Sequence, residues 1–180
     1  MAHAITFVRL LAVAPAAWAF SLGDSVSAWL PMMLVAVAIA SDVLDGIVAR
    51  RTAAASPSGM LFDHTTDCLF VTSGLAGASV ANLVPMVLPV LVPIAFAQYV
   101  LDSYFLHRQR QLRMSYLGRW NGILYFAPLV MIAIAALHLP ALSELARVLV
   151  YPSTVLLAAS TVASIIDRAV APLRMNTGVR

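Results

Sequence analysis

Half of the eight acidic residues of the chain lie within one window of 26 residues. They are Asp42, Asp45, Asp63 and Asp67, and spacings of three and four place each pair on one face of its own helix. Four carboxylates close together in a low dielectric repel one another, so protons or divalent cations must accompany them. Because all the ligands are oxygens, the set favours Mg²⁺, Mn²⁺ or Ca²⁺ over Zn²⁺.

Small residues and an arginine accompany these carboxylates. Gly46, Ala49 and Gly59 lie on the same surfaces and leave room for a ligand to approach the backbone. Arg50 offers a guanidinium that binds phosphate in a bidentate way. A divalent cation held by oxygens, beside an arginine and a glycine-lined pocket, is what a pyrophosphate ligand requires.

A structural interpretation of the aspartates stays open. Asp42 and Asp45 can pair with neighbouring Arg50 and Arg51, while Asp63 can cap a helix. Any one of these residues fits that interpretation well. All four together, at this spacing, favour a functional site, because ionisable groups inside a membrane are costly.

The elements that carry these residues are predicted to be membrane helices. The chain is 62% hydrophobic and 11% charged, which excludes a water-soluble globular domain. Windows of about 19 residues predict six spans in one all-α bundle, a single domain over residues 1–180. The spans are Ile5–Ser21, Trp29–Arg50, Phe62–Leu83, Val84–His107, Trp120–His138 and Leu145–Ile166.

Arginines predict how the bundle is oriented. Ten of the eleven fall on the side of both termini, and only Arg147 falls on the other side. The positive-inside rule then places both termini in the cytoplasm, which an even number of spans allows. A signal peptide in the first segment is the alternative. There is no basic tail or stripe, so nucleic-acid binding is not expected.

The complete acidic motif is long and specific. It reads Asp42-x-x-Asp45-Gly46-x-x-Ala49-Arg50, eight residues, Gly59, three residues, Asp63, three residues, Asp67. The motif resembles the signature of the CDP-alcohol phosphotransferase family, with all eight fixed positions present. The Ile5-Thr6 pair followed by Arg9 and Pro15 is similar to the opening helix of that family. The resemblance covers the whole chain and implies a six-helix membrane enzyme with cytoplasmic catalysis, often a homodimer.

The resemblance also implies a reaction and a set of site residues. The reaction transfers a phosphatidyl or phosphoalcohol group from a CDP-linked donor to a hydroxyl and releases CMP. Asp42, Asp45 and Asp63 would bind the first of two Mg²⁺ or Mn²⁺ ions, and Asp67 would bind the second or act as the base. Gly46, Arg50 and Ser56 would hold the nucleotide, with Ala49 and Gly59 in the same motif.

The substrates remain open between two branches of the family. The six-span length resembles bacterial enzymes that use CDP-diacylglycerol and a small polar acceptor, such as phosphatidylglycerophosphate synthases, and indicates a bacterial inner membrane. The stretch Ala49–Asp63 with His64 resembles the choline and ethanolamine branch, which uses a CDP-aminoalcohol and diacylglycerol. Candidate acceptor contacts are Arg108, Arg110, Arg113, Arg119 and His64.

The acidic residues also fit two other functions, and two further polar residues lie in a predicted span. An intramembrane prenyltransferase would carry two separated Asp-rich motifs, and the sequence has one. A cation or proton transporter is the non-enzymatic alternative, because buried carboxylates also line ion paths. Gln98 and Asp102, four residues apart, either line the acceptor pocket or pair across helices.

Overall fold

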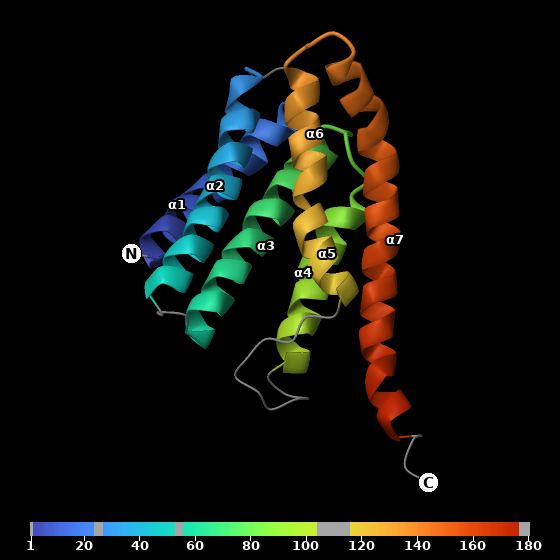
Figure 1. The fold of residues 1–180 in the computed structure, drawn as a ribbon. Helices are drawn as coiled ribbons and strands as arrows, with labels where there is room; N and C mark the ends of the chain where they lie inside the picture. Colours follow the sequence, from blue (N-terminus) through green and yellow to red (C-terminus); the bar gives the residue numbers. More distant parts are fainter. Residues whose placement is uncertain (1, 24–26, 53–55, 104–115, 177–180) are drawn as a thin grey trace.

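The structure, a computed structural model, describes the backbone of residues 2–23, 27–52, 56–103 and 116–176. Every long element in this part of the chain is an α-helix, and the helices pack side by side into one elongated bundle (Figure 1). The helices are α1 (Ala2–Ser21), α2 (Trp29–Thr52), α3 (Pro57–Val80), α4 (Val87–Leu101), α5 (Tyr116–Leu124), α6 (Phe126–Ala136) and α7 (Leu142–Asn176).

Among the described residues, three segments are long and apolar enough to cross a membrane. They are Trp29–Ile47, Leu117–Ala136 and Leu142–Val170, while the apolar stretches Thr6–Ser21 and Val87–Leu101 are shorter. The expectation of an all-helical fold is therefore confirmed, and these segments fit a membrane protein, whereas six spans remain a prediction. Helix α3 is not among the candidate spans, although its central part is buried in the bundle, with Phe70, Leu75 and Ala78 fully covered.

Helix α3 begins earlier than the sequence predicted. The predicted span begins at Phe62, but the helix starts at Pro57. Ser56 is the N-cap, and its side-chain oxygen accepts a hydrogen bond from the Gly59 backbone N–H at 3.0 Å. A serine N-cap followed by proline is a strong helix start, because proline has no N–H to leave unsatisfied there. A cap role for Asp63 is therefore wrong.

The same helix ends before the predicted Leu83. Asn82 has a φ of +60°, a left-handed conformation that asparagine tolerates better than most residues. The Leu83 N–H then donates to the carbonyl of Ala78 at 2.9 Å, which closes the end of the helix.

The expected fifth span is divided into α5 and α6 at Tyr125. Pro128 explains the break, because it cannot donate to the carbonyl of Leu124 four residues earlier and its ring crowds that carbonyl. The last helix is longer than predicted and runs the full height of the bundle (Figure 1).

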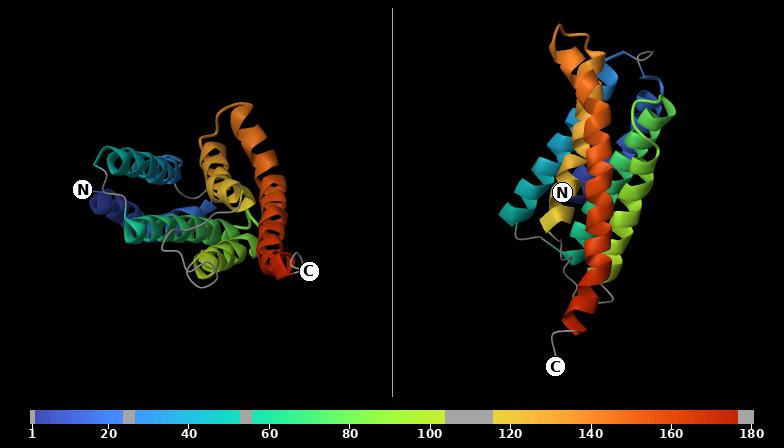
Figure 2. Two further views of the ribbon diagram at one scale, coloured as in Figure 1. Left: turned by 60° about the horizontal axis from the view of Figure 1, so that its bottom comes forward. Right: turned by 90° about the vertical axis from the view of Figure 1, so that its right-hand side faces the viewer.

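Helix α1 packs against both α2 and α3, which have little direct contact with each other. The two views of Figure 2 show this arrangement along and across the bundle. A Cβ atom added at Gly77 of α3 would lie 2.2 Å from the carbonyl oxygen of Ala17, so glycine is what lets α1 and α3 approach so closely. Helices α2 and α3 are therefore connected mainly through α1.

The apolar core lies where α1, α3 and α6 meet. Phe20, Phe70 and Leu129 are buried there, and Phe70 stacks on Phe126 with ring centroids 6.1 Å apart. This core fixes the position of α1 relative to α3, and so the position of the polar residues at the first half of α1.

Candidate active site

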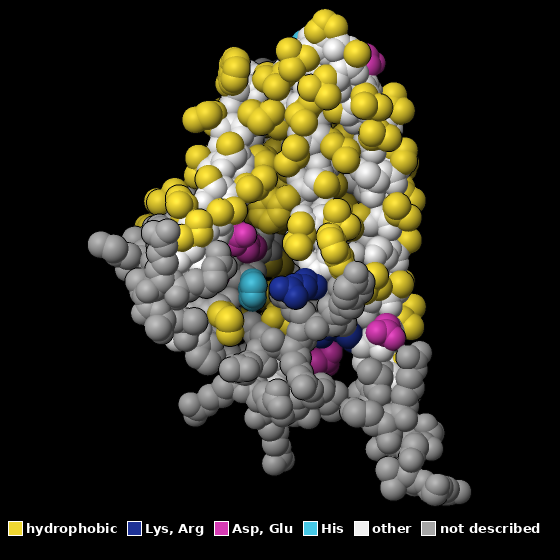
Figure 3. Space-filling view, viewed as in Figure 1, with side chains coloured by type: hydrophobic (Ala, Val, Ile, Leu, Met, Phe, Trp, Pro, Cys, Tyr) yellow, Lys and Arg dark blue, Asp and Glu magenta, His cyan; other side chains and the backbone are white. Residues whose placement is uncertain are grey.

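The four aspartates of the motif come together at one end of the bundle. Asp42 and Asp45 lie in the second half of α2, and Asp63 and Asp67 lie in the first half of α3. Asp45 is the most buried, with 7% of its side chain exposed, and Asp42 is the most open, with 52%. In Figure 3, charged side chains and a histidine gather near this end, below a surface covered by hydrophobic side chains.

Arg9 of α1 lies at the centre of these carboxylates and is completely buried. Its Nη1 atom donates to the Oδ1 atoms of Asp63, at 3.0 Å, and of Asp67. Its Nη2 atom lies 3.8 Å from a carboxylate oxygen of Asp42 and of Asp45. A planar guanidinium with several donors suits such a forked arrangement. The carboxylates of α2 and α3 therefore meet through an arginine of α1.

Two further hydroxyl groups complete this network. The Nε atom of Arg9 donates to Ser41 Oγ at 3.1 Å, and Ser41 in turn donates to the carbonyl of Ala38. Thr6, one turn before Arg9 on α1, donates to Asp45 Oδ2 at 2.8 Å. Thus Thr6 and Arg9 connect α1 to α2 by hydrogen bonds to the carboxylate and the serine of that helix.

The network still leaves buried polar atoms without hydrogen bonds. They are Asp45 Oδ1 and Arg9 Nη2. A buried carboxylate oxygen without a donor is costly, and a cation is the ligand that would satisfy it. Asp63, His64 and Asp67 each offer one atom within 4.8 Å of the others, an arrangement that fits a metal ion. The residues present therefore fit the divalent cation that their oxygens would select.

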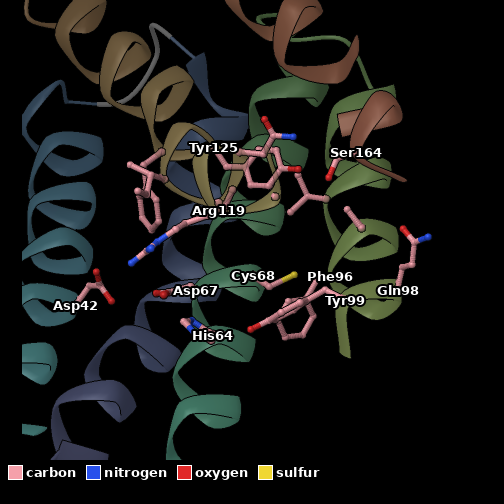
Figure 4. A pocket seen from close by; sticks show the side chains of 18 of the residues that line it. Asp42, His64, Asp67, Cys68, Phe96, Gln98, Tyr99, Arg119, Tyr125 and Ser164 are labelled. Carbon is pink, nitrogen blue, oxygen red and sulfur yellow. The ribbon is translucent and has the colours of Figure 1, made fainter. Parts of the chain in front are cut away.

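A cavity of about 440 Å³ opens beside the carboxylates, between α3, α4, α5 and α7. Asp42, His64 and Asp67 border it at one end, and Arg119 extends from α5 toward the two aspartates (Figure 4). Most of the wall is apolar. The other lining residues are Ile39, Cys68, Val71, Val92, Ala95, Phe96, Gln98, Tyr99, Gly118, Asn121, Gly122, Ile123, Tyr125, Phe126, Ser164 and Arg168.

The polar residues of this cavity bind one another across helices. Arg168 of α7 lies 5.3 Å from the ring centre of Tyr99 on α4 and 3.6 Å from Asp102. Gln98 lines the cavity and also donates to the carbonyl of Ile165 at 3.0 Å. Gln98 therefore lines the cavity and also bonds across helices, and Asp102 pairs with α7, whereas a role of this pair at the acceptor stays a prediction.

Asn121 supplies an unsatisfied donor in the cavity wall. It is 3% exposed, and its Oδ1 accepts a hydrogen bond from Ser160 at 2.7 Å. Its Nδ2 atom is buried and has no hydrogen-bond partner. A polar group of a bound ligand would satisfy this donor.

The remaining predicted site residues are only partly described. Gly46 is half-buried on α2, one residue after Asp45, and Ser56 and Gly59 form the N-terminal turn of α3. The backbone of Ala49 and Arg50 belongs to α2, while their side chains lie outside the described part. Arg108, Arg110 and Arg113 also lie outside the described residues.

The sequence analysis missed the functional placement of Arg9, Thr6 and Ser41. From the sequence, Arg9 is expected as a cytoplasmic charge and as part of the opening-helix pattern, without a partner among the aspartates. Its position inside an apolar stretch was the available signal, because an arginine within a membrane helix normally has a buried partner.

The fold and this centre define a class: an all-helical membrane-type protein with an acidic centre that opens into a cavity. The chain matches the family model of CDP-alcohol phosphatidyltransferases over residues 1–167. The chain therefore belongs to the CDP-alcohol phosphatidyltransferase family, a family of membrane enzymes that generally use a divalent metal ion. No curated protein and no solved structure shows significant similarity to it.

Proposed function

We propose that the protein transfers a phosphatidyl group from CDP-diacylglycerol to the hydroxyl of a small polar acceptor and releases CMP. The family establishes transfer from a CDP-alcohol. The observation that carries the finer proposal is the position of Asp42 and Asp67 at the end of one largely apolar cavity. Such a cavity suits a donor with an apolar part whose pyrophosphate lies against the acidic end.

The reaction needs one bond to form and one to break. The acceptor oxygen attacks the phosphorus that carries diacylglycerol, and the phosphoanhydride bond to CMP breaks. In this proposal the acceptor hydroxyl gives its proton to Asp67, which borders the cavity. Asp67 is therefore the proposed catalytic residue.

The metal and nucleotide contacts follow from the motif. Asp42, Asp45, Asp63 and Asp67 would hold two Mg²⁺ or Mn²⁺ ions, which supply positive charge against the pyrophosphate and the CMP leaving group. The nucleotide contacts of the proposal are Gly46, Ala49, Arg50, Ser56 and Gly59.

Acceptor recognition is proposed at the mouth of the cavity. Arg119 is exposed and reaches toward Asp42 and Asp67. The rings of His64 and Tyr99 meet edge-on, with their centroids 6.5 Å apart. Arg108, Arg110 and Arg113 belong to the same proposed acceptor region in the sequence. An arginine can bind an acceptor phosphate with two parallel hydrogen bonds.

We further propose a homodimer in a bacterial inner membrane, with the acidic end facing the cytoplasm. The arginine distribution supports the orientation. The enzyme family favours transfer chemistry over the cation or proton transporter considered from the sequence.

The proposal is tested by reconstituting the protein in liposomes and measuring CMP release with Mg²⁺. CDP-diacylglycerol with a panel of small polar acceptors forms one arm, and a CDP-aminoalcohol with diacylglycerol forms the other. We expect release in the first arm only, and its loss in Asp67→Asn while labelled donor still binds. Release in the second arm would identify the aminoalcohol branch instead. Near-normal turnover of Asp67→Asn would remove Asp67 from the role of base.

A further inference from the structure

We propose that Arg9 is the internal counter-cation of the four aspartates and that it competes with a divalent cation for the oxygens of Asp63 and Asp67. The inference rests on the proposed function in one respect, namely that the carboxylates bind a divalent cation. Beyond that function, we infer that Arg9 determines how tightly the carboxylates bind the cation.

The first observation concerns the burial of Arg9 and its contacts with the carboxylates. Its side chain is 0% exposed, and its guanidinium lies within 4 Å of an oxygen of each of the four aspartates. A buried charge without a partner is very costly, so Arg9 and the aspartates stabilise one another. The described part of the chain has no other arginine with this number of acidic contacts.

The second observation is that Arg9 leaves the charge of the cluster unbalanced. One positive charge faces four negative ones, and Asp45 Oδ1 and Arg9 Nη2 are buried without hydrogen bonds. Arg9 therefore reduces the repulsion among the carboxylates without removing it. Additional positive charge is needed for a stable buried cluster.

The third observation is that a cation and Arg9 need the same atoms. Nη1 of Arg9 donates to Asp63 Oδ1 and Asp67 Oδ1, the carboxylates that form the group fitting a metal ion together with His64. A divalent cation close to a guanidinium is also repelled by it. Binding must therefore weaken the contacts of Nη1, while Nε can keep its hydrogen bond to Ser41.

This competition predicts two opposite effects of removing the positive charge. Without a divalent cation, the carboxylates lose the buried counter-charge that contacts all four of them, and the bundle becomes less stable. With the cation, the site binds it more tightly, because no resident charge opposes it. If Arg9 instead served to orient the ligands of a bound metal, its removal would weaken binding. If it were only a packing residue, stability would fall equally with and without metal.

The experiment measures Mn²⁺ binding and thermal unfolding of the full chain in detergent. Free Mn²⁺ is followed by electron paramagnetic resonance, and melting is compared in EDTA and in saturating Mn²⁺. Arg9→Gln is the test variant. Arg147→Gln is the matched control, because it removes the same charge from an exposed arginine that lines a separate cavity with Phe20 and Asn82.

For Arg9→Gln we expect Mn²⁺ affinity to rise about tenfold or more, since one unit charge a few ångströms away has been removed. The gap between melting temperatures in Mn²⁺ and in EDTA should widen relative to the wild type. Arg147→Gln should change neither quantity. Unchanged or weaker Mn²⁺ affinity of Arg9→Gln, or an equal loss of melting temperature in both conditions, would overturn the proposal.

A second variant covers the case in which Arg9→Gln does not fold. Arg9→Lys keeps the charge but lacks the fork that reaches Ser41 and both α3 carboxylates together. We expect it to bind Mn²⁺ more tightly than the wild type, and equal or weaker binding would contradict the competition.

The metal centre itself is tested separately, by measuring Mn²⁺ binding to the wild type and to Asp63→Asn. We expect the wild type to bind Mn²⁺ and Asp63→Asn to have lost this binding. If neither the wild type nor the Arg9 variants bind Mn²⁺, the proposed metal centre fails as well, whereas a failure confined to the Arg9 variants concerns this inference alone.

Discussion

Asp45 differs from the other three aspartates in how its charge is held. It is nearly inaccessible, one oxygen accepts a hydrogen bond from Thr6, and the other has no hydrogen-bond donor. Thr6 is itself buried, with 3% exposure. This hydrogen bond, together with the one from Arg9 to Ser41, joins the start of α1 to α2 at the acidic centre.

We predict that Thr6→Val destabilises the protein by about 1.5–3 kcal/mol, the usual contribution of a hydrogen bond to a charged group. Valine matches the shape of threonine, so the change removes the hydroxyl with little change in packing. Thermal or chemical unfolding in detergent measures the effect. Thr154→Val is the control, because Thr154 is equally buried but bonds only a neutral carbonyl of its own helix. An equal cost at both positions would contradict the special role of Thr6.

A second residue-scale prediction concerns Arg119, which reaches toward Asp42 and Asp67 in the cavity. If Arg119 binds an acidic acceptor, Arg119→Gln should raise the acceptor KM about tenfold, as expected for the loss of a charge-assisted hydrogen bond. The donor KM should stay unchanged, and Arg147→Gln should alter neither constant. Steady-state CMP release measures both constants. An unchanged acceptor KM would assign Arg119 to topology or to contacts with anionic lipids.

At the scale of elements, the close contact between α1 and α3 decides where Arg9 is held. Gly77 provides this contact, since a methyl group there would meet the backbone of Ala17 at 2.2 Å. Arg9 belongs to α1, and Asp63 and Asp67 belong to α3. A shift of α1 along α3 would therefore separate the charges that pair in the acidic centre.

We predict that Gly77→Ala destabilises the protein by about 1–3 kcal/mol, the usual cost of overpacking a buried contact. The gain in helix propensity that alanine normally brings is smaller than this cost. CMP release should fall as well, because Thr6 and Arg9 move with α1. For stability, Gly122→Ala is the control, since an added Cβ atom meets nothing within 4 Å there. Equal melting temperatures for the two variants would show that the contact is not tight.

At the scale of the whole molecule, the acidic centre lies at one end of the bundle and the loop between α6 and α7 lies at the other (Figure 1). Charge is distributed unevenly between these ends, with Arg147 the single arginine expected on the second side. The asymmetry predicts which end faces the cytoplasm. The donor nucleotide would then reach the site from the cytoplasm.

Single cysteines test this orientation on a Cys68→Ser background, because Cys68 is the only cysteine of the chain. Ser58 and Leu139 are both exposed and lie at opposite ends. We predict that a membrane-impermeant maleimide labels Ser58→Cys in inside-out vesicles and Leu139→Cys in right-side-out cells. The reversed pattern would place the acidic end outside and contradict the arginine-based orientation.

The sequence was sufficient for features that depend on local spacing. Asp42 with Asp45, and Asp63 with Asp67, share a helix face because the α-helix repeats every 3.6 residues, whatever surrounds it. The apolar segments and the family motif are equally local in character. Helix α3 runs from Pro57 to Val80 rather than over the predicted Phe62–Leu83, and the Ser56-Pro57 pair and Asn82 carry the signals that explain both ends.

Only the tertiary structure decided which charges meet. Arg9 is separated from Ser41 by 32 residues and from Asp67 by 58, and no helical periodicity relates positions so far apart. Their meeting depends on α1 packing against both α2 and α3, which in turn depends on a close backbone contact at Gly77. An apolar helix can bury any of its faces, so its sequence alone does not select the neighbour. Packing made that selection, and it made Arg9, expected only on the cytoplasmic side of the first span, the buried partner of the four aspartates.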